Sequence, residues 1–313
     1  MPNTYGTLNG VLVVQQTIKS LLAMFPYLSQ ITTDFSEKPI LYSQTATSRV
    51  AVPHGDAQTF VPGTGYVATN VTTVDIPVTM NIWLHDTYSI TGADASSTNR
   101  DLIQEQADLS AYAIGNTLSK KLFAIITAAA FPQVMPISAV GMNRLSTNAV
   151  RAKLNKLGVP DMNRVMILNS DYYAALGADI TIVGNLYNKG SDDSITEGSL
   201  PRVGGFQPSE YPLMQDQGYG LQGVAGNKEA LVLTTRTPVN PAPSDTPIPG
   251  RIETVQDART GFAFQLREYY DMILDKFTRS LVVIAGVAVG YSETDAGTGA
   301  STCSRMVRIT TPA

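Results

Sequence analysis

The sequence predicts an α+β fold with an N-terminal arm, an extended β-hairpin, a long helix and a mixed α/β domain. Three patterns carry that prediction. Apolar residues alternate from Val74 to Leu84, which is typical of a strand with one buried face. Helical periodicity then extends over residues 99–130. From Gly141 onward, short apolar runs typical of strands are mixed with short helical segments.

Residues 1–35 are expected to form the arm. The apolar residues of this segment lie on one face of a short helix: Val14, Ile18, Leu21, Leu22 and Phe25. Pro26 ends the helix, because proline cannot continue the hydrogen-bond ladder. Polar connectors flank the helix on both sides, so we expect it to dock apart from the main body.

Residues 36–90 are expected to form the hairpin. One strand is predicted over Ile40–Val52 and the return strand over Tyr66–Tyr88, where Pro77 indicates an edge strand or a bulge. A two-stranded hairpin is marginal alone in water, so this one is expected to find its support outside the subunit. The residues expected to make that contact are Arg49, Val74, Ile76, Val78, Met80 and Ile82.

Residues 91–140 contain the long helix. Ser97 or Thr98 is expected to cap it, and Pro132 to end it. About 32 residues at a rise of about 1.5 Å each predict a rod of roughly 48 Å.

Residues 141–280 are expected to form the mixed α/β domain, and residues 281–313 a closing strand with a polar tail. A helix capped by Ser146 or Thr147 and a buried strand at Arg164–Leu168 are the clearest elements. Further elements are a helix at 171–176, a polar loop at 185–202, strands near 207–213, 229–235 and 262–266, a proline-rich connector at 238–249, a buried strand at 281–289 and a weak strand at 306–309.

The chain is poor in charge. Charged residues make up 15% of it, whereas roughly 25% is usual for soluble domains. A neutral, hydroxyl-rich surface would explain this, but we favour extensive protein–protein interface, where charge is depleted at the buried centre. The net charge of −4 and the absence of a Lys/Arg run argue against a nucleic-acid-binding footprint.

The most apolar helical segment, 11–25, is too short to span a bilayer, so no membrane association is expected.

The sequence offers little for catalysis or metal binding, so we expect no enzyme activity and no cofactor. His54 and His85 have no second His or Cys at ligand spacing, and Cys303 has no plausible base nearby. Gly218–Gly223 matches a dinucleotide-binding pattern by letter, but a predicted strand follows it where that motif needs a helix. Asp192, Asp193 and Glu197 are read as a solvated acidic loop, because their spacing resembles no calcium loop.

The order of these elements resembles the major capsid protein of tailed bacteriophages, which has the Hong Kong 97 fold. Three stretches are similar to that family: Gly158–Leu176, Gly205–Phe206 with the strand after it, and Arg267–Asp271 through Ala285–Gly290. The resemblance covers about residues 10–292. It implies a peripheral domain with a spine helix at 91–140, peripheral-domain strands within 36–90, and an axial domain at 141–280 whose acidic loop lies toward the capsomer axis.

The resemblance also implies hexamers and pentamers that assemble into an icosahedral shell around double-stranded DNA. The hairpin would lie over a neighbouring subunit. Replacing Val78 and Met80 with aspartate is therefore expected to block assembly and leave the subunit folded. A portal protein, a separate scaffolding protein or none, and cement proteins are the further partners implied. The location implied is the virion, after assembly in the host cytoplasm. No lysine occurs between Lys38 and Lys120, so the cross-link that a hairpin lysine forms in the best-known member of this family is not expected.

Three alternatives compete with this reading. An encapsulin-type nanocompartment shell shares the fold and encloses enzymes instead of a genome. A carboxylate-dependent hydrolase would need paired acids facing a pocket, and the sequence shows no convincing pair. A tail-tube subunit is disfavoured by the long helix.

Overall fold

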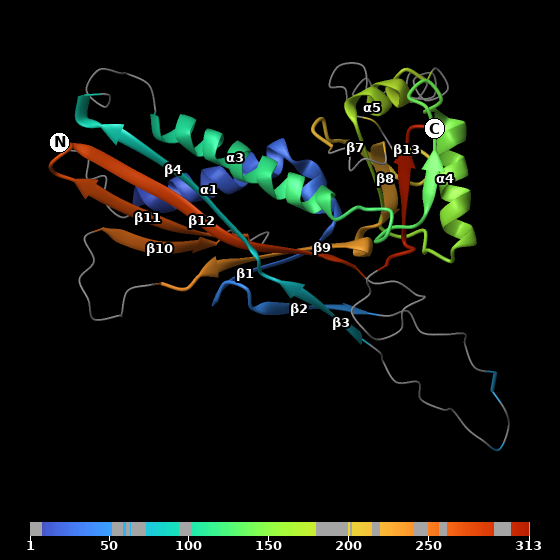
Figure 1. Ribbon diagram of the computed structural model, residues 1–313, viewed down its shortest axis with the longest axis horizontal. Helices are drawn as coiled ribbons and strands as arrows, with labels where there is room; N and C mark the ends of the chain where they lie inside the picture. Colours follow the sequence, from blue (N-terminus) through green and yellow to red (C-terminus); the bar gives the residue numbers. More distant parts are fainter. Residues whose placement is uncertain are drawn as a thin grey trace.

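The computed structural model describes residues 8–51, 59–60, 63, 73–93, 102–179, 200, 202–214, 220–240, 250–256, 262–290 and 302–312. Two β-sheets form the body, and a two-stranded ribbon projects from it (Figure 1). The large sheet has six strands and the small sheet has five.

The large sheet is built around one long strand, β12. Its members are β1 (Thr32–Ile40), β4 (Ile82–Thr91), β9 (Leu231–Pro238), β10 (Arg251–Gln256), β11 (Ala263–Asp271) and β12 (Lys276–Val289). β12 pairs antiparallel with β4 over Lys276–Ala285, with β11 over Lys276–Val282 and with β9 over Ile284–Val289. Residues Leu281–Ala285 are all buried, as the apolar run predicts for a strand covered on both faces.

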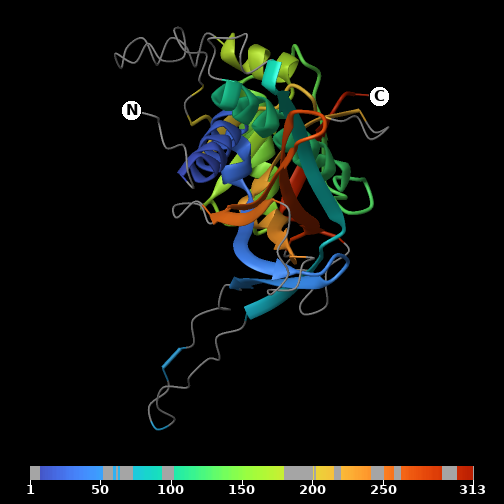
Figure 2. The same cartoon turned by 90° about the vertical axis from the view of Figure 1, so that its left-hand side faces the viewer.

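Two helices cover one face of the large sheet. α1 (Leu8–Met24) and α3 (Leu102–Ala124) lie together on the same side, and the short helix η1 (Pro26–Gln30) follows α1 (Figure 2). Gly115 allows the close approach, because a Cβ there would lie 2.3 Å from the Phe25 ring. The expectation of a separate arm is therefore wrong: Ile18, Leu21 and Phe25 belong to the main core.

α3 is shorter than the sequence predicts. It has 23 residues, or about 35 Å at about 1.5 Å each, and ends at Ala124 rather than at Pro132. The chain turns after Phe123, whose carbonyl accepts the N–H of Ile126, and this turn buries Ile126 and Phe131. Ser97 and Thr98, the expected caps, lie outside the described residues.

The small sheet has the order β5-β13-β8-β6-β7. Its elements are β5 (Val134–Pro136), β6 (Arg164–Leu168), β7 (Gln207–Glu210), β8 (Leu221–Asn227) and β13 (Met306–Thr310), with α4 (Arg144–Lys156) and α5 (Ser170–Gly177) beside them. β6 has the predicted bounds. Asn143 caps α4 in place of Ser146 or Thr147, and its side chain accepts the N–H of Ser146.

β13 corrects the expectation of a polar tail. All five of its residues are buried, and it lies between β5 and β8. This segment looks polar in the sequence because it contains arginines, which bond to other groups inside the protein. Arg308 Nε donates to the Phe131 carbonyl at 2.7 Å, and Arg305 Nη1 donates to Glu229 Oε2 at 2.5 Å.

The two sheets also divide the chain differently from the predicted domains. Residues 141–280 do not form one unit, because β6, β7 and β8 belong to the small sheet whereas β9, β10 and β11 belong to the large one. The predicted closing segment 281–313 is split in the same way between β12 and β13. The chain passes between the sheets through the short helix η2 (Lys228–Ala230).

An aromatic cluster joins the two sheets. Tyr211, just after β7, stacks on Phe123 of α3 with ring centroids 4.6 Å apart, and the Tyr27 ring lies 5.0 Å from that of Tyr211. The Tyr27 hydroxyl donates to Ser119 Oγ at 2.6 Å. Burial raises the pKa of Tyr211 to about 12, and it also raises the pKa of Tyr27. Both phenols therefore stay neutral where they hold the sheets together.

The ribbon consists of β2 (Thr45–Ala51) and β3 (Thr73–Thr79). Pro77 is tolerated because β3 pairs only with β2 among the described strands, as predicted for an edge strand. The predicted strand Ile40–Val52 is broken at 41–44, where Ser43 has a φ of +67°. β1, read from sequence as part of a polar connector, pairs in parallel with β9.

The base of the ribbon is buried against the chain's own large sheet. Ile76 and Val78 cluster with Val232 of β9, and Met80 clusters with Ile284 of β12. Gly286 makes this crossing possible, because a Cβ there would lie 2.6 Å from the Thr79 carbonyl oxygen. Ile82 lies in the core beneath the helices. The expectation that these four residues are supported only from outside the subunit is therefore wrong.

The corrected prediction concerns Val78→Asp. A carboxylate at this buried position has no partner, so we expect the free energy of unfolding to fall by at least about 3 kcal/mol. Thr79→Asp is the matched control, because the neighbouring Thr79 is exposed and should tolerate the charge. Urea unfolding of dissociated subunits checks this; equal midpoints for the two variants would show that the base is not part of the subunit core.

Candidate assembly surfaces

The turn between β11 and β12 presents three consecutive apolar side chains to solvent. Met272 is 86% exposed, Ile273 93% and Leu274 64%. We call these residues the apolar tip. Exposed apolar residues are ordinary when scattered, but a contiguous group at the end of a sheet indicates a contact surface.

The apolar tip is held rigidly by its flanking aspartates. Asp271 Oδ1 accepts the N–H groups of Ile273 at 2.9 Å and Leu274 at 3.2 Å. The Tyr270 hydroxyl donates to Asp275 Oδ1 at 2.5 Å, and the Asp275 carbonyl accepts the N–H of Gly92 at 3.1 Å. A Cβ at Gly92 would lie 2.1 Å from the Asp275 carboxylate, so a larger residue there would require that side chain to shift. The tip is thus presented at little further entropic cost on binding.

Sequence reasoning missed the apolar tip. It identified Arg267–Asp271 and Ala285–Gly290 as closing strands and gave the turn between them no role. A signal was present: three apolar residues stand between two aspartates, where a hairpin turn is normally polar.

The ribbon is the second surface. It projects from the body beneath β1 and β9 (Figure 1). Arg49 Nε lies 3.1 Å from Asp75 Oδ1 across its two strands, both side chains are exposed, and Val74 is half-buried. An exposed pair of this kind contributes little to stability. Of the six predicted hairpin residues, only Arg49 and Val74 thus remain accessible to a neighbour.

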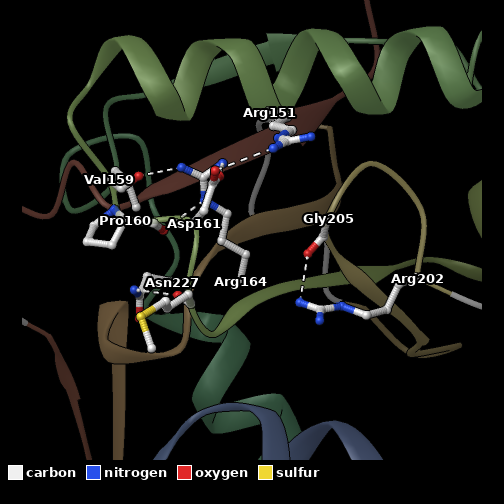
Figure 3. Close-up of polar contacts among 9 residues, drawn as sticks. Arg151, Val159, Pro160, Asp161, Arg164, Arg202, Gly205 and Asn227 are labelled. Carbon is white, nitrogen blue, oxygen red and sulfur yellow. Dashed lines mark hydrogen bonds and ion pairs between the residues drawn. The ribbon is translucent and has the colours of Figure 1, made fainter.

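The third candidate surface belongs to the small sheet. It is the exposed loop before β6, which Arg164 holds in place (Figure 3). Arg164 is buried, and its Nη2 and Nε donate to the carbonyls of Val159 and Pro160. Its Nη1 lies 2.7 Å from Asp161 Oδ1. Burial lowers the pKa of the Arg164 guanidinium, and Asp161 partly offsets that effect.

Two further contacts fix this loop from outside. Arg151 of α4 reaches Asp161 at 3.4 Å, and Asn227 Nδ2 donates to the Met162 carbonyl at 3.2 Å (Figure 3). The Met162 side chain itself is exposed. The arrangement is structural: each polar group bonds to the backbone or to an opposite charge, which leaves a fixed loop with an apolar side chain at its surface.

The chemistry of the described residues is otherwise sparse. No group of three or more His, Cys, Asp or Glu side chains among them is placed to hold a metal ion. Burial raises the pKa of the Cys303 thiol to about 11, so it is not a thiolate nucleophile at neutral pH. β8 follows Gly220 directly, so the glycine-rich run does not open a helix as the dinucleotide-binding motif requires. No helix in the described part of the chain is long and apolar enough to cross a membrane.

Solved structures of phage origin share this architecture. The chain matches the capsid of Ralstonia phage GP4 with a TM-score of 0.54 at 11% identity, over 91% of this chain and 87% of that one. The chain has a phage capsid fold. A structure from Gordonia phage Cozz matches with a TM-score of 0.50 at 10% identity, over 91% and 86% of the two chains. No protein-family model and no curated protein sequence matches the chain.

The phage capsid fold confirms the predicted α+β class and the mixture of strands with a few helices. It covers both sheets, because the match extends over nine-tenths of the chain. Asp192, Asp193 and Glu197, the predicted axial loop, lie outside the described residues, and their role stays a prediction.

Arg164→Ala tests the anchor of the loop before β6. We expect it to lower the free energy of unfolding by about 2–4 kcal/mol, because two carbonyls and a carboxylate lose their buried partner. Arg151→Ala removes the exposed ion pair between Arg151 and Asp161 and should lower the free energy of unfolding by no more than about 0.5 kcal/mol. Urea unfolding of both variants is the measurement, and equal losses would contradict the assignment.

Proposed function

We propose that this chain is the major capsid protein of a tailed phage and assembles with copies of itself into an icosahedral head shell around double-stranded DNA. The observation that carries the proposal is the match to the phage GP4 capsid over nearly the whole length of both chains. A fold can serve several functions, so the surfaces of this chain have to support the proposal as well.

The apolar tip supplies that support. A lone subunit gains nothing from exposing Met272, Ile273 and Leu274 on a turn fixed by two aspartates, because each methylene left in water forgoes about 0.8 kcal/mol of burial. A neighbouring subunit would recover this energy. The charge deficit of the sequence agrees, since charges are depleted where subunits meet.

In this proposal the fold takes the Hong Kong 97 form. α3 is the spine helix, the large sheet belongs to the peripheral domain, and the small sheet with α4 and α5 belongs to the axial domain. The acidic loop with Asp192, Asp193 and Glu197 lies toward the capsomer axis of hexamers and pentamers. The outer ribbon, including Arg49 and Val74, lies over a neighbouring subunit.

The role is structural rather than catalytic, and the location is the virion after assembly in the host cytoplasm. The shell encloses DNA without reading its sequence, in keeping with the absence of a basic run. A portal protein, with scaffolding or cement proteins where the phage uses them, completes the head. No observation on the described residues favours the encapsulin shell or the hydrolase.

The proposal is tested by expressing the protein and examining it by sucrose-gradient sedimentation and negative-stain electron microscopy. We expect closed shells or regular capsomers. A discrete monomer or small oligomer under all conditions, including expression with the neighbouring genes, would overturn the proposal.

Ile273→Asp tests the apolar tip in the same assay. We expect the subunit to stay folded, because the side chain is exposed, and the assembled fraction to fall at least tenfold because a charge would be buried between subunits. Ile273→Val keeps the apolar character and is the matched control. Unchanged assembly of the aspartate variant would remove the tip from the interface.

A further inference from the structure

The described residues cover only half of the second face of the large sheet, the face opposite α1 and α3. The ribbon base covers the part near β9 and the C-terminal half of β12, through Val78 and Met80. The remaining part lies over β4, the N-terminal half of β12, β11 and β10. Strand register places Thr87, Ser280, Arg267 and Ile252 in one row across these four strands.

This row forms the floor of a trough of about 280 Å³. The trough is also lined by Gly250, Arg251, Glu268, Tyr269 and Thr278. We call it the Arg267 trough. Its open side faces away from the helices, because Leu266 and Leu281, the neighbours of Arg267 and Ser280 along their strands, point into the core beneath α1 and α3.

Arg267 is held in place by a neutral group. Its Nε and Nη2 donate to Gln265 Oε1 at 2.9 and 2.7 Å, and Gln265, itself buried, donates to the Pro238 carbonyl at 3.0 Å. No carboxylate among the described residues forms an ion pair with this guanidinium. The Glu268 carboxylate forms an ion pair with Arg279, with Oε1 2.5 Å from Nε, and the Glu253 carboxylate forms one with Arg251. Burial lowers the pKa of Arg267, so its positive charge is retained at a cost that an anion would relieve.

The trough also offers hydroxyl groups and apolar walls. Thr87 Oγ1 and Ser280 Oγ lie 2.5 Å apart, and Thr87 Oγ1 also lies 3.3 Å from His85 Nδ1. When Thr87 donates to Ser280, the Ser280 hydroxyl hydrogen can turn to a ligand. Ile252, the register partner of Arg267, and Tyr269 add apolar surface to the lining. One fixed guanidinium, hydroxyl donors and apolar sides suit a single carboxylate on a side chain.

We propose that the Arg267 trough receives a carboxylate side chain from a second copy of this chain. This inference rests on the proposed function and identifies one contact by which neighbouring subunits recognise each other. Charge complementarity favours a second copy, because the chain carries 26 acidic against 22 basic residues and so supplies carboxylates in excess. A DNA backbone is disfavoured, since repeated phosphates would require a row of arginines and lysines, and Arg251 is already paired.

The fluorescence of a natural tryptophan can report whether this contact forms. Trp83, the sole tryptophan, is 44% exposed on the same face of β4 as Thr87. Four residues along a strand separate the two by about 13 Å. A subunit contact that buries about 800 Å² per partner is wide enough to cover both.

The experiment combines assembly with quenching of tryptophan fluorescence. In wild-type shells we expect acrylamide to quench Trp83 several-fold less than in dissociated subunits, with emission shifted to shorter wavelength. Arg267→Glu should reduce the assembled fraction at least tenfold, with an unchanged circular dichroism spectrum, because it sets a carboxylate against a carboxylate. Arg267→Lys should assemble to an intermediate extent. Arg144→Glu makes the same charge change on an exposed residue of α4 and should assemble as the wild type does.

The outcomes separate this inference from the proposed function. If wild-type shells form but Trp83 stays as accessible to acrylamide as in free subunits, the inference fails and the shell function stands. Wild-type assembly of Arg267→Glu would overturn it as well. Protection of Trp83 in dissociated subunits on addition of a 30-base-pair DNA duplex would assign the trough to nucleic acid and contradict the proposal. If no shells form from the wild-type protein, the proposed function itself fails.

Discussion

The architecture depends on covering both faces of β12. Leu281 and Val283 point toward the helices, whereas Val282 and Ile284 point to the opposite face, and all four side chains are buried. α1 and α3 cover the first face. On the second face the ribbon base covers Ile284, but no described element lies over the row that contains Arg267 and Ser280. The described residues thus cover one face of β12 completely and leave the other partly open, and in the proposed function a neighbouring subunit would cover the open part.

The same constraint gives the ribbon a fixed root. Met80 is fully buried against Ile284, and Gly286 lets the Thr79 carbonyl pass close over β12. The direction of the ribbon is therefore set by the subunit's own sheet, whereas its outer part, with Arg49 and Asp75, remains exposed. In a shell, a rooted ribbon and a rigid apolar tip would offer a neighbour preorganised surfaces, which lowers the entropy lost on association.

Local patterns in the sequence predicted local elements well. The apolar run of β6, the helical pattern of α4 and the continuous apolar stretch in β12 each have one dominant signal. The pairing of strands that are distant in the sequence could not be predicted from such local patterns. β1 and β13 look polar because residues such as Asp34 and Arg308 bond to Arg236 and to the Phe131 carbonyl, partners far away in sequence. Alternation along β3 correctly indicated one buried face, but periodicity cannot say whether the covering surface belongs to the same chain.

Cryo-electron microscopy of the assembled particle at side-chain resolution tests this account most directly. The account predicts a closed shell in which the apolar tip and the open face of the large sheet each lie against a neighbouring subunit, with a carboxylate beside Arg267. A particle in which both surfaces face solvent would contradict it, because the incomplete covering of β12 would then have no role in assembly.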